Sequence, residues 1–315
     1  MAARADRAIP PTSIDRTGPV GLSSGLAVEV PWIDRWVDTV HGRVAIRETR
    51  GTSLPLVLLH GNSMSKDAFR RQMDGALGAR HRLVAIDLPG HGASDNAVNP
   101  GHSYTLTRFA DVVVEVAEIL DLERFAILGW SLGGHVALEV CAGAPGVVGV
   151  MLVGAPAIGA DPASILRAFR PGPFLERSML EKLSGEEVEA FAKEAGVAGD
   201  ENLCAAIRRA DGRARVAVLR DALAGGASDA RAIVETMQVP LAIVDGAEDL
   251  IVERSYVDDL SYATLWEGRT HVIPGVGHAP FWEIAPLFNS ILARFLADLS
   301  ARDSSDCAFG ACLAG

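Results

Sequence analysis

A serine flanked by two glycines is the first candidate for chemistry in this chain. Residues 125–134 read FAILGWSLGG, an apolar run that ends in Gly-x-Ser-x-Gly with Ser131 at its centre. The pattern is typical of a nucleophile elbow, a tight strand-to-helix turn that exposes a serine in a strained backbone conformation. Gly129 and Gly133 would leave room for the neighbouring chain where a Cβ atom would clash. By itself the pattern also fits an ordinary strand, glycine turn and helix.

The partners that a nucleophilic serine needs come later in the chain. A serine hydroxyl is a weak nucleophile at neutral pH, so a base must take its proton and an acid must orient that base. The apolar runs 239–245 and 271–278 lead into loops that carry Asp249 and His278, in the chain order Ser, Asp, His. Because the carboxyl ends of parallel strands meet at one edge of a sheet, we expect Ser131, Asp249 and His278 to converge there as nucleophile, acid and base. Three neighbouring carboxylates remain alternatives for the acid: Asp245, Glu248 and Glu253.

A candidate oxyanion hole lies nearer the N-terminus. Residues 55–62 read PLVLLHGN, which predicts a buried strand followed by a turn. Acyl transfer places negative charge on the former carbonyl oxygen, and preorganised N–H donors stabilise that charge. We assign the donors to the backbone N–H groups of Asn62 and of Leu132, which opens a predicted helix and benefits from its positive N-terminal end. The predicted substrate contacts are Ser63, Trp130 and Phe191.

Short β-branched runs alternate with helical segments along most of the chain. Helical patterns fall at 66–77, 104–120, 132–143 and 280–298, between apolar runs of strand length. Near the N-terminus, WVDTVHGRVAIRE predicts a hairpin that turns at His41-Gly42 and forms an antiparallel edge. The sequence therefore predicts an α/β fold with a doubly wound, mostly parallel sheet.

One long segment breaks the alternation. Residues 157–236 contain no convincing strand and several short helical patterns, which predicts an inserted helical lid; in it, Ser184 and Glu187 form a capping box that starts a helix. An apolar group of lid residues could form a substrate pocket: Phe169, Phe174, Leu175, Met179, Leu183 and Phe191. The predicted organisation is a flexible arm (1–35), a hydrolase-type core (36–156 and 237–299), the lid (157–236) and a disordered tail (300–315).

Composition excludes several classes of partner. The formal net charge of −11 over 315 residues argues against nucleic acid and anionic membranes, both of which select for clustered Lys and Arg. With neither a signal peptide nor an apolar run long enough to span a bilayer, the chain is expected to be cytoplasmic. The eight histidines and four cysteines are dispersed, so we expect no metal and no other cofactor.

Five segments resemble the α/β-hydrolase superfamily in register over roughly residues 40–298: HGNSMSKDAF, DLPGHGASD, GWSLGGH, TMQVPLAIVDGAED and VIPGVGHAPFWE. A narrower set is similar to the metal-independent N-acyl-homoserine lactonases of this fold: HGNS at 60–63, GWSLGGH at 129–135, ADGRAR at 210–215 and ATLWEGRTHVIPGVGHAPF at 263–281. The resemblance implies a small-molecule lactone or ester substrate and the same roles for Ser131, Asp249, His278, Asn62 and Leu132. Where that family varies between Asp and Glu at the acid, this chain has the shorter side chain.

Other functions remain open from the sequence. A general carboxylesterase or a carbon–carbon bond hydrolase would use the same triad, and a non-catalytic small-molecule receptor could use the same scaffold. Enzymes of this fold that form an alkyl ester on an elbow aspartate are excluded, because the elbow residue is Ser131. The oligomeric state is not set by these patterns.

Overall fold

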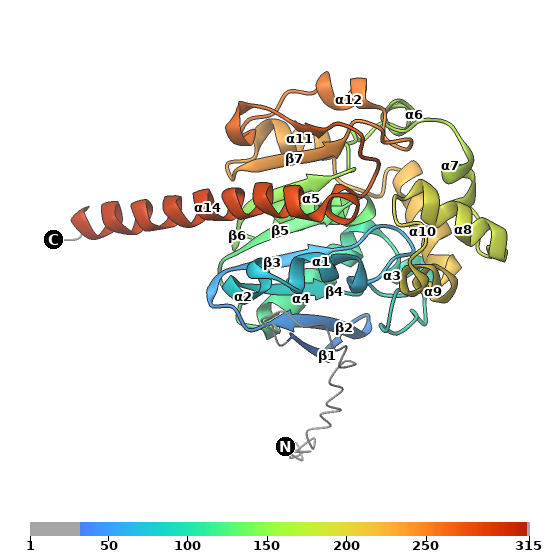
Figure 1. Ribbon diagram of the computed structural model, residues 1–315, viewed down its shortest axis with the longest axis horizontal. Coiled ribbons are helices and arrows are strands. Elements are labelled where there is room, and N and C mark those ends of the chain that lie inside the picture. Colours follow the sequence, from blue (N-terminus) through green and yellow to red (C-terminus); the bar gives the residue numbers. More distant parts are fainter. Residues whose placement is uncertain (1–31, 314–315) are drawn as a thin grey trace, which may run out of the picture.

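The computed structural model describes residues 32–313, with side chains as far as residue 302. Its centre is one sheet of eight strands in the order β1-β2-β4-β3-β5-β6-β7-β8 (Figure 1). The strands are β1 (Trp32–Thr39), β2 (Gly42–Thr49), β3 (Ser53–Leu59), β4 (His81–Ile86), β5 (Phe125–Trp130), β6 (Val147–Val153), β7 (Leu241–Gly246) and β8 (His271–Ile273). Strands β3 to β8 are parallel, and β1 and β2 add an antiparallel edge. The predicted α/β fold with a mostly parallel sheet is confirmed.

The antiparallel edge is a hairpin, as predicted, but its turn lies one residue earlier than the predicted His41-Gly42. Thr39 of β1 pairs with Gly42 of β2, so the chain turns at Val40-His41, and Gly42 adopts a φ of 110° that favours glycine. β1 begins at Trp32, within the segment 1–35 for which the sequence predicted a flexible arm. Residues 1–31 of that segment lie outside the described residues.

Alternate residues of the central strands point to opposite faces of the sheet. In β3, Val57 and Leu59 join one apolar cluster with the helices α4 (Leu106–Ile119) and α5 (Leu132–Gly143), while Leu56 and Leu58 join a second cluster on the other face. Figure 1 shows α14 crossing that second face. Because helices cover both faces, β5 reads as an unbroken apolar run and every one of its residues is buried. The helices that cover the second face are η1 (Lys66–Phe69), α1 (Arg70–Met73), α2 (Ala76–Arg80), α13 (Pro280–Glu283) and α14 (Ala285–Leu313).

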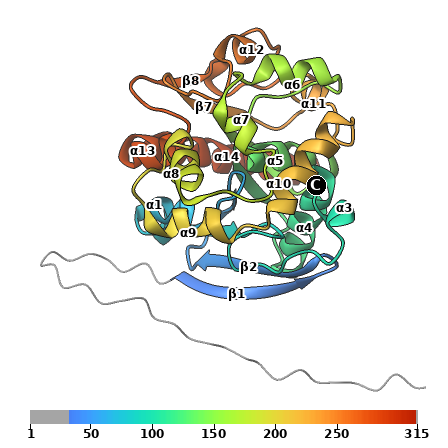
Figure 2. The ribbon, with the colours of Figure 1, turned by 90° about the vertical axis from the view of Figure 1, so that its right-hand side faces the viewer.

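The described residues between β6 and β7 are helical, without a strand. The helices of this segment are α6 (Pro162–Ala168), α7 (Pro173–Arg177), α8 (Gly185–Glu194), α9 (Glu201–Arg209), α10 (Gly212–Leu223) and α11 (Ala230–Thr236). Figures 1 and 2 show α7 to α10 together at one end of the sheet, whereas α11 packs on α5. The predicted capping box is present at the start of α8, where Ser184 and Glu187 each accept a hydrogen bond from the other's backbone N–H. No described helix is both long and apolar enough to cross a membrane.

The C-terminal segment differs from its prediction. The composition of 300–315 predicted a disordered tail, but α14 continues to Leu313. The segment contains no proline, and extending an existing helix adds a hydrogen bond for each residue without a new nucleation step. Helix propagation is the physical reason for the difference.

Candidate active site

Ser131 occupies the sharp turn between β5 and α5. Its backbone angles are φ 52° and ψ −118°, a region that non-glycine residues rarely adopt. The two flanking glycines make the turn sterically possible, because a Cβ atom on Gly129 would lie 2.2 Å from the carbonyl oxygen of Gly133. A Cβ atom on Gly133 would likewise lie 2.2 Å from the carbonyl oxygen of Leu59. The geometry is that of a nucleophile elbow.

His278 and Asp249 form a buried pair. His278 Nδ1 lies 2.7 Å from Asp249 Oδ2, and Asp249 Oδ1 accepts hydrogen bonds from the N–H groups of Ile251 (2.7 Å) and Val252 (3.2 Å). Burial disfavours the charged carboxylate, but the charge and hydrogen bond of His278, together with the two N–H donors, outweigh burial and lower the pKa of Asp249. The other ring nitrogen, His278 Nε2, is buried and has no hydrogen-bond partner within residues 32–302. One nitrogen is therefore oriented by a carboxylate and the other is available.

The alternative acids have other partners. Asp245 Oδ1 accepts from the N–H of Gly154 (2.9 Å), and Asp245 Oδ2 pairs with Arg254 (3.2 Å). Burial, reinforced by the negative charge of Asp249, raises the pKa of Asp245 to about 6. Glu248 is exposed, and Glu253 accepts a hydrogen bond from the hydroxyl of Ser255. Of the four carboxylates considered, Asp249 is the one in contact with His278.

One glutamate holds the backbone on both sides of His278. Glu283 accepts hydrogen bonds from the N–H groups of Gly277 (2.9 Å) and Ala279 (3.0 Å), one through each carboxylate oxygen. The sequence interpretation missed Glu283, although a glutamate in the first turn of a helix that starts with Pro280 is a signal for such a cap. The residues before and after His278 are therefore both hydrogen-bonded to α13.

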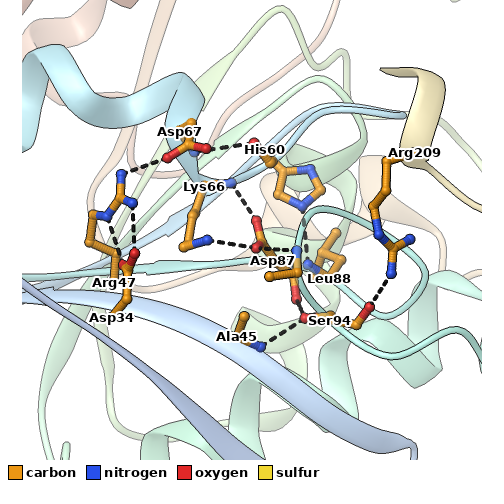
Figure 3. A network of polar contacts seen from close by, with 12 residues as sticks. Asp34, Ala45, Arg47, His60, Lys66, Asp67, Asp87, Leu88, Ser94 and Arg209 are labelled. Carbon is orange, nitrogen blue, oxygen red and sulfur yellow. Dashed lines mark hydrogen bonds and ion pairs between the residues drawn. The ribbon is translucent and has the colours of Figure 1, made fainter. Parts of the chain in front are cut away.

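The loop that carries Asn62 is fixed to the end of β4 (Figure 3). His60 Nε2 accepts a hydrogen bond from the N–H of Leu88 (3.0 Å), and burial lowers the pKa of His60 to about 4, so the ring is neutral and can accept. After the loop, Lys66 donates to Asp87 through its backbone N–H (2.6 Å) and its Nζ (2.9 Å). Asn62 therefore sits on a loop that is anchored before and after it.

A cavity of about 260 Å³ brings several predicted residues together under the lid. Asn62, Ser131 and Leu132 line it. Most of its wall is apolar and comes from the core and the lid: Leu106, Ile158, Ile165, Phe169, Phe174 and Val218. His135, one turn after Ser131 on α5, also lines it and was not assigned a role from the sequence. The space next to Ser131 is therefore bounded mostly by apolar side chains.

The three predicted substrate contacts are not in the cavity wall. The indole of Trp130 points into the core, against Gly61 and Phe281. Phe191 of α8 is fully buried behind Phe174, which does line the cavity, and their stacked ring centroids are 4.6 Å apart. The hydroxyl of Ser63 is buried between two polar side chains, described below. His278 is also absent from the wall, and the ring of Phe174 lies 6.2 Å from its ring.

No group of three or more His, Cys, Asp and Glu residues that could hold a metal ion exists in the described part of the chain. The arrangement is therefore one of a serine at an elbow, a buried His–Asp pair and a cavity with an apolar wall.

Comparisons with known proteins agree with the fold. The sequence profile of the "Alpha/beta hydrolase family" matches residues 56–287. A crystal structure of a variant of the N-acyl homoserine lactonase AidH, complexed with N-hexanoyl homoserine, is 37% identical with a TM-score of 0.83, and the match covers 85% of this chain and 98% of that one. The pimeloyl-[acyl-carrier protein] methyl ester esterase of Nitrosomonas europaea is 27% identical over 77% of this chain and 96% of its own length. A 2-hydroxy-6-oxononadienedioate/2-hydroxy-6-oxononatrienedioate hydrolase of Burkholderia vietnamiensis is 26% identical over 81% of this chain and 91% of its own length. The chain belongs to the alpha/beta hydrolase family, as its motifs predicted.

Proposed function

We propose that this protein is a serine hydrolase that opens the lactone ring of N-acyl-homoserine lactones. The observation that carries the proposal is Ser131, which stands on a strained elbow in the wall of an apolar cavity roofed by the lid. The likeness to AidH, which was solved with N-hexanoyl homoserine, supports this substrate class.

In the proposed first step, His278 Nε2 takes the proton of Ser131 as Oγ attacks the lactone carbonyl carbon. Asp249 holds the ring through Nδ1 and stabilises the imidazolium that forms. The orphaned state of His278 Nε2 supports this role, because a buried nitrogen without a partner has a proton-accepting position to spare.

The oxyanion then lies between the N–H groups of Asn62 and Leu132. Leu132 is the first residue of α5, so the positive end of that helix adds to the stabilisation. Asn62 contributes from the anchored loop after β3, and both residues line the cavity.

Collapse of the tetrahedral intermediate breaks the ring C–O bond and leaves an acyl-enzyme. His278 returns its proton to the ring oxygen, which becomes a hydroxyl on the same molecule. Water, deprotonated by His278, then attacks the ester carbonyl. The Ser131–acyl bond breaks as His278 returns the proton to Ser131 Oγ, which releases N-acyl-homoserine and restores the free enzyme. Because the tethered hydroxyl can attack again, the apolar wall must retain the acyl chain while water enters.

A general carboxylesterase or carbon–carbon bond hydrolase is the second candidate. It is favoured by the curated relatives at 26–27% identity, which are by name a methyl ester esterase and a 2-hydroxy-6-oxononadienedioate hydrolase. Both activities would use the same residues and differ in the shape of the cavity.

Proton release at constant pH distinguishes the candidates. The substrates are N-butanoyl- and N-dodecanoyl-homoserine lactone beside p-nitrophenyl butyrate, with Ser131→Ala as the blank and Ser261→Ala, at an exposed loop position, as the matched control. We expect Ser131-dependent opening of the lactones that the control retains. Ester hydrolysis with inert lactones would overturn the lactonase proposal and favour the second candidate.

A further inference from the structure

A buried arginine of the lid reaches the loop that carries Asn62. Arg215 lies on α10, within the ADGRAR segment, and its Nη1 donates to Ser63 Oγ at 2.6 Å. Ser63 Oγ in turn donates to Asn62 Oδ1 at 3.0 Å. Arg215 is 3% exposed and Ser63 is 1% exposed, so the three side chains form a relay from the lid to the cavity that is closed to water for most of its length.

The relay has only one polarity. A guanidinium can donate but never accept, so Ser63 Oγ must accept from Arg215 and its single O–H is left to donate. Among the described residues, the acceptor within hydrogen-bond distance of that O–H is Asn62 Oδ1 at 3.0 Å, so the amide oxygen of Asn62 faces Ser63. The amide nitrogen, Asn62 Nδ2, is then left as a donor on a residue that lines the cavity.

The backbone of Ser63 argues that its hydroxyl is needed. Its φ is 62°, in the left-handed region that favours glycine and is costly for most other residues. The backbone alone would favour glycine at this position. The presence of a serine whose hydroxyl makes two hydrogen bonds therefore indicates that the hydroxyl has a role.

The environment of Arg215 argues in the same direction. Besides Ser63, its hydrogen-bond partners in the described residues are the carbonyl oxygens of Leu180 (2.8 Å) and Glu181 (3.3 Å), all uncharged. Burying a cation without a carboxylate in contact is unfavourable for stability, which favours a functional reason for Arg215.

The helix α10, which carries Arg215, is anchored to the core at its N-terminal end. Asp211 accepts a hydrogen bond from the hydroxyl of Tyr104 (2.7 Å), and the N–H of Asp211 donates to the carbonyl oxygen of Gly90 (2.8 Å).

We propose that Arg215 is a positioning residue of the active site, which acts through Ser63 to hold the Asn62 side chain with its Nδ2 donor directed to a carbonyl oxygen of the substrate. The lid then contributes to the polar part of the site as well as to its apolar wall. This inference rests on the site proposed above and adds a positioning residue to it.

Kinetics on a double-mutant cycle test the relay. Arg215→Met removes the bond to Ser63 together with two bonds to backbone carbonyls, and Ser63→Gly removes both bonds of the relay. Ser63→Gly also suits the positive φ, so it is expected to fold even where Arg215→Met does not. We expect each to lower kcat/KM by about tenfold in the native background, the effect of one lost hydrogen bond to the transition state, and by less than about twofold in an Asn62→Ala background. Arg220→Met, an exposed arginine on the same helix, is the matched control and should retain native activity.

Equal losses of kcat/KM in both backgrounds would overturn the proposal, because Arg215 and Ser63 would then act independently of Asn62. Native activity of both variants would overturn it as well.

A spectroscopic measurement decides the relay without turnover. The chain has five asparagines, so selective ¹⁵N-asparagine labelling gives a small set of side-chain amide signals, and Asn62→Ala identifies the pair that belongs to Asn62. We expect this pair to shift or broaden in Ser63→Gly and to stay unchanged in Arg220→Met. An Asn62 pair unaffected by Ser63→Gly would overturn the relay, whereas inert lactones with a perturbed Asn62 pair would overturn the proposed substrate and leave the relay intact.

Discussion

The indole Nε1 of Trp130 donates a 2.9 Å hydrogen bond to the backbone carbonyl oxygen of His278. Trp130 immediately precedes Ser131, so this bond joins the strand that carries the elbow to the loop that carries the histidine. The indole also covers Gly61, where an added Cβ atom would lie 3.1 Å from the ring. One buried side chain thus contacts His278 and the residue before Asn62, and it belongs to the residue before Ser131.

Trp130→Phe should lower kcat more than it changes KM. Phenylalanine keeps most of the packing but leaves the buried carbonyl of His278 without its donor, which costs about 1–3 kcal/mol of stability and loosens the histidine loop. Urea unfolding and steady-state kinetics measure the two effects, with Trp36→Phe on the exposed side of β1 as the control. A variant with native kcat and a raised KM would instead support the sequence-based expectation that Trp130 contacts the substrate.

Asp249→Asn should nearly abolish activity, by about 10⁴-fold in kcat, because the amide cannot stabilise the imidazolium and favours the wrong tautomer. The matched change is Asp245→Asn, four residues earlier and also buried, whose side chain contacts Gly154 and Arg254. We expect Asp245→Asn to keep kcat within about tenfold of the native value. Stopped assays with the same ester measure kcat of both variants. A larger loss of kcat in Asp245→Asn than in Asp249→Asn would assign the acid to Asp245.

Asp245 should also affect stability with a defined dependence on pH. Burial raises the pKa of Asp245 from 3.8 to about 6, so the folded protein binds this proton more tightly than the unfolded chain does. The contribution of Asp245 to stability is therefore most favourable below about pH 4 and is lost as pH rises to about 6. Asparagine does not titrate, so the stability of Asp245→Asn relative to the native protein should increase by about 2–3 kcal/mol between pH 4 and pH 7. Guanidinium unfolding at half-unit pH steps measures this, and a difference independent of pH would contradict the prediction.

The elbow could be predicted from sequence because its requirement is local. Two glycines around Ser131 are needed by the backbone itself, whatever the surrounding side chains. The predicted contact of Trp130 with the substrate depended instead on the direction of its side chain. Trp130 is the last residue of a strand in which neighbouring side chains face opposite ways, so its position next to Ser131 does not place it on the same side.

Contacts of the lid depend on how its helices pack, which the apolar pattern does not determine. Phe174 and Phe191 are equally apolar in sequence, but Phe174 lines the cavity and Phe191 lies behind it. Arg215 gave no signal beyond its family-like segment, because its partners are Ser63, 152 residues earlier, and two backbone carbonyls. Such long-range pairs follow from tertiary structure alone.

We expect a narrow extension of the cavity beyond His135 to determine the preference for acyl-chain length. A second space of about 30 Å³ shares five wall residues with the main cavity, which places the two side by side: Leu106, His135, Ile158, Ile165 and Ala222. Ala222→Phe would fill this junction and exclude the end of a long chain while leaving the region around Ser131 open. Losing the burial of two methylene groups costs about 1.6 kcal/mol, so kcat/KM for N-dodecanoyl-homoserine lactone should fall by about 15-fold and that for the N-butanoyl compound by less than about threefold. Ala224→Phe, at the exposed end of the same helix, is the control and should leave the ratio of the two substrates unchanged. Equal losses of kcat/KM on both substrates would contradict the prediction. They would mean that the long acyl chain does not enter this junction, because only a chain that occupies it loses more affinity than a short one.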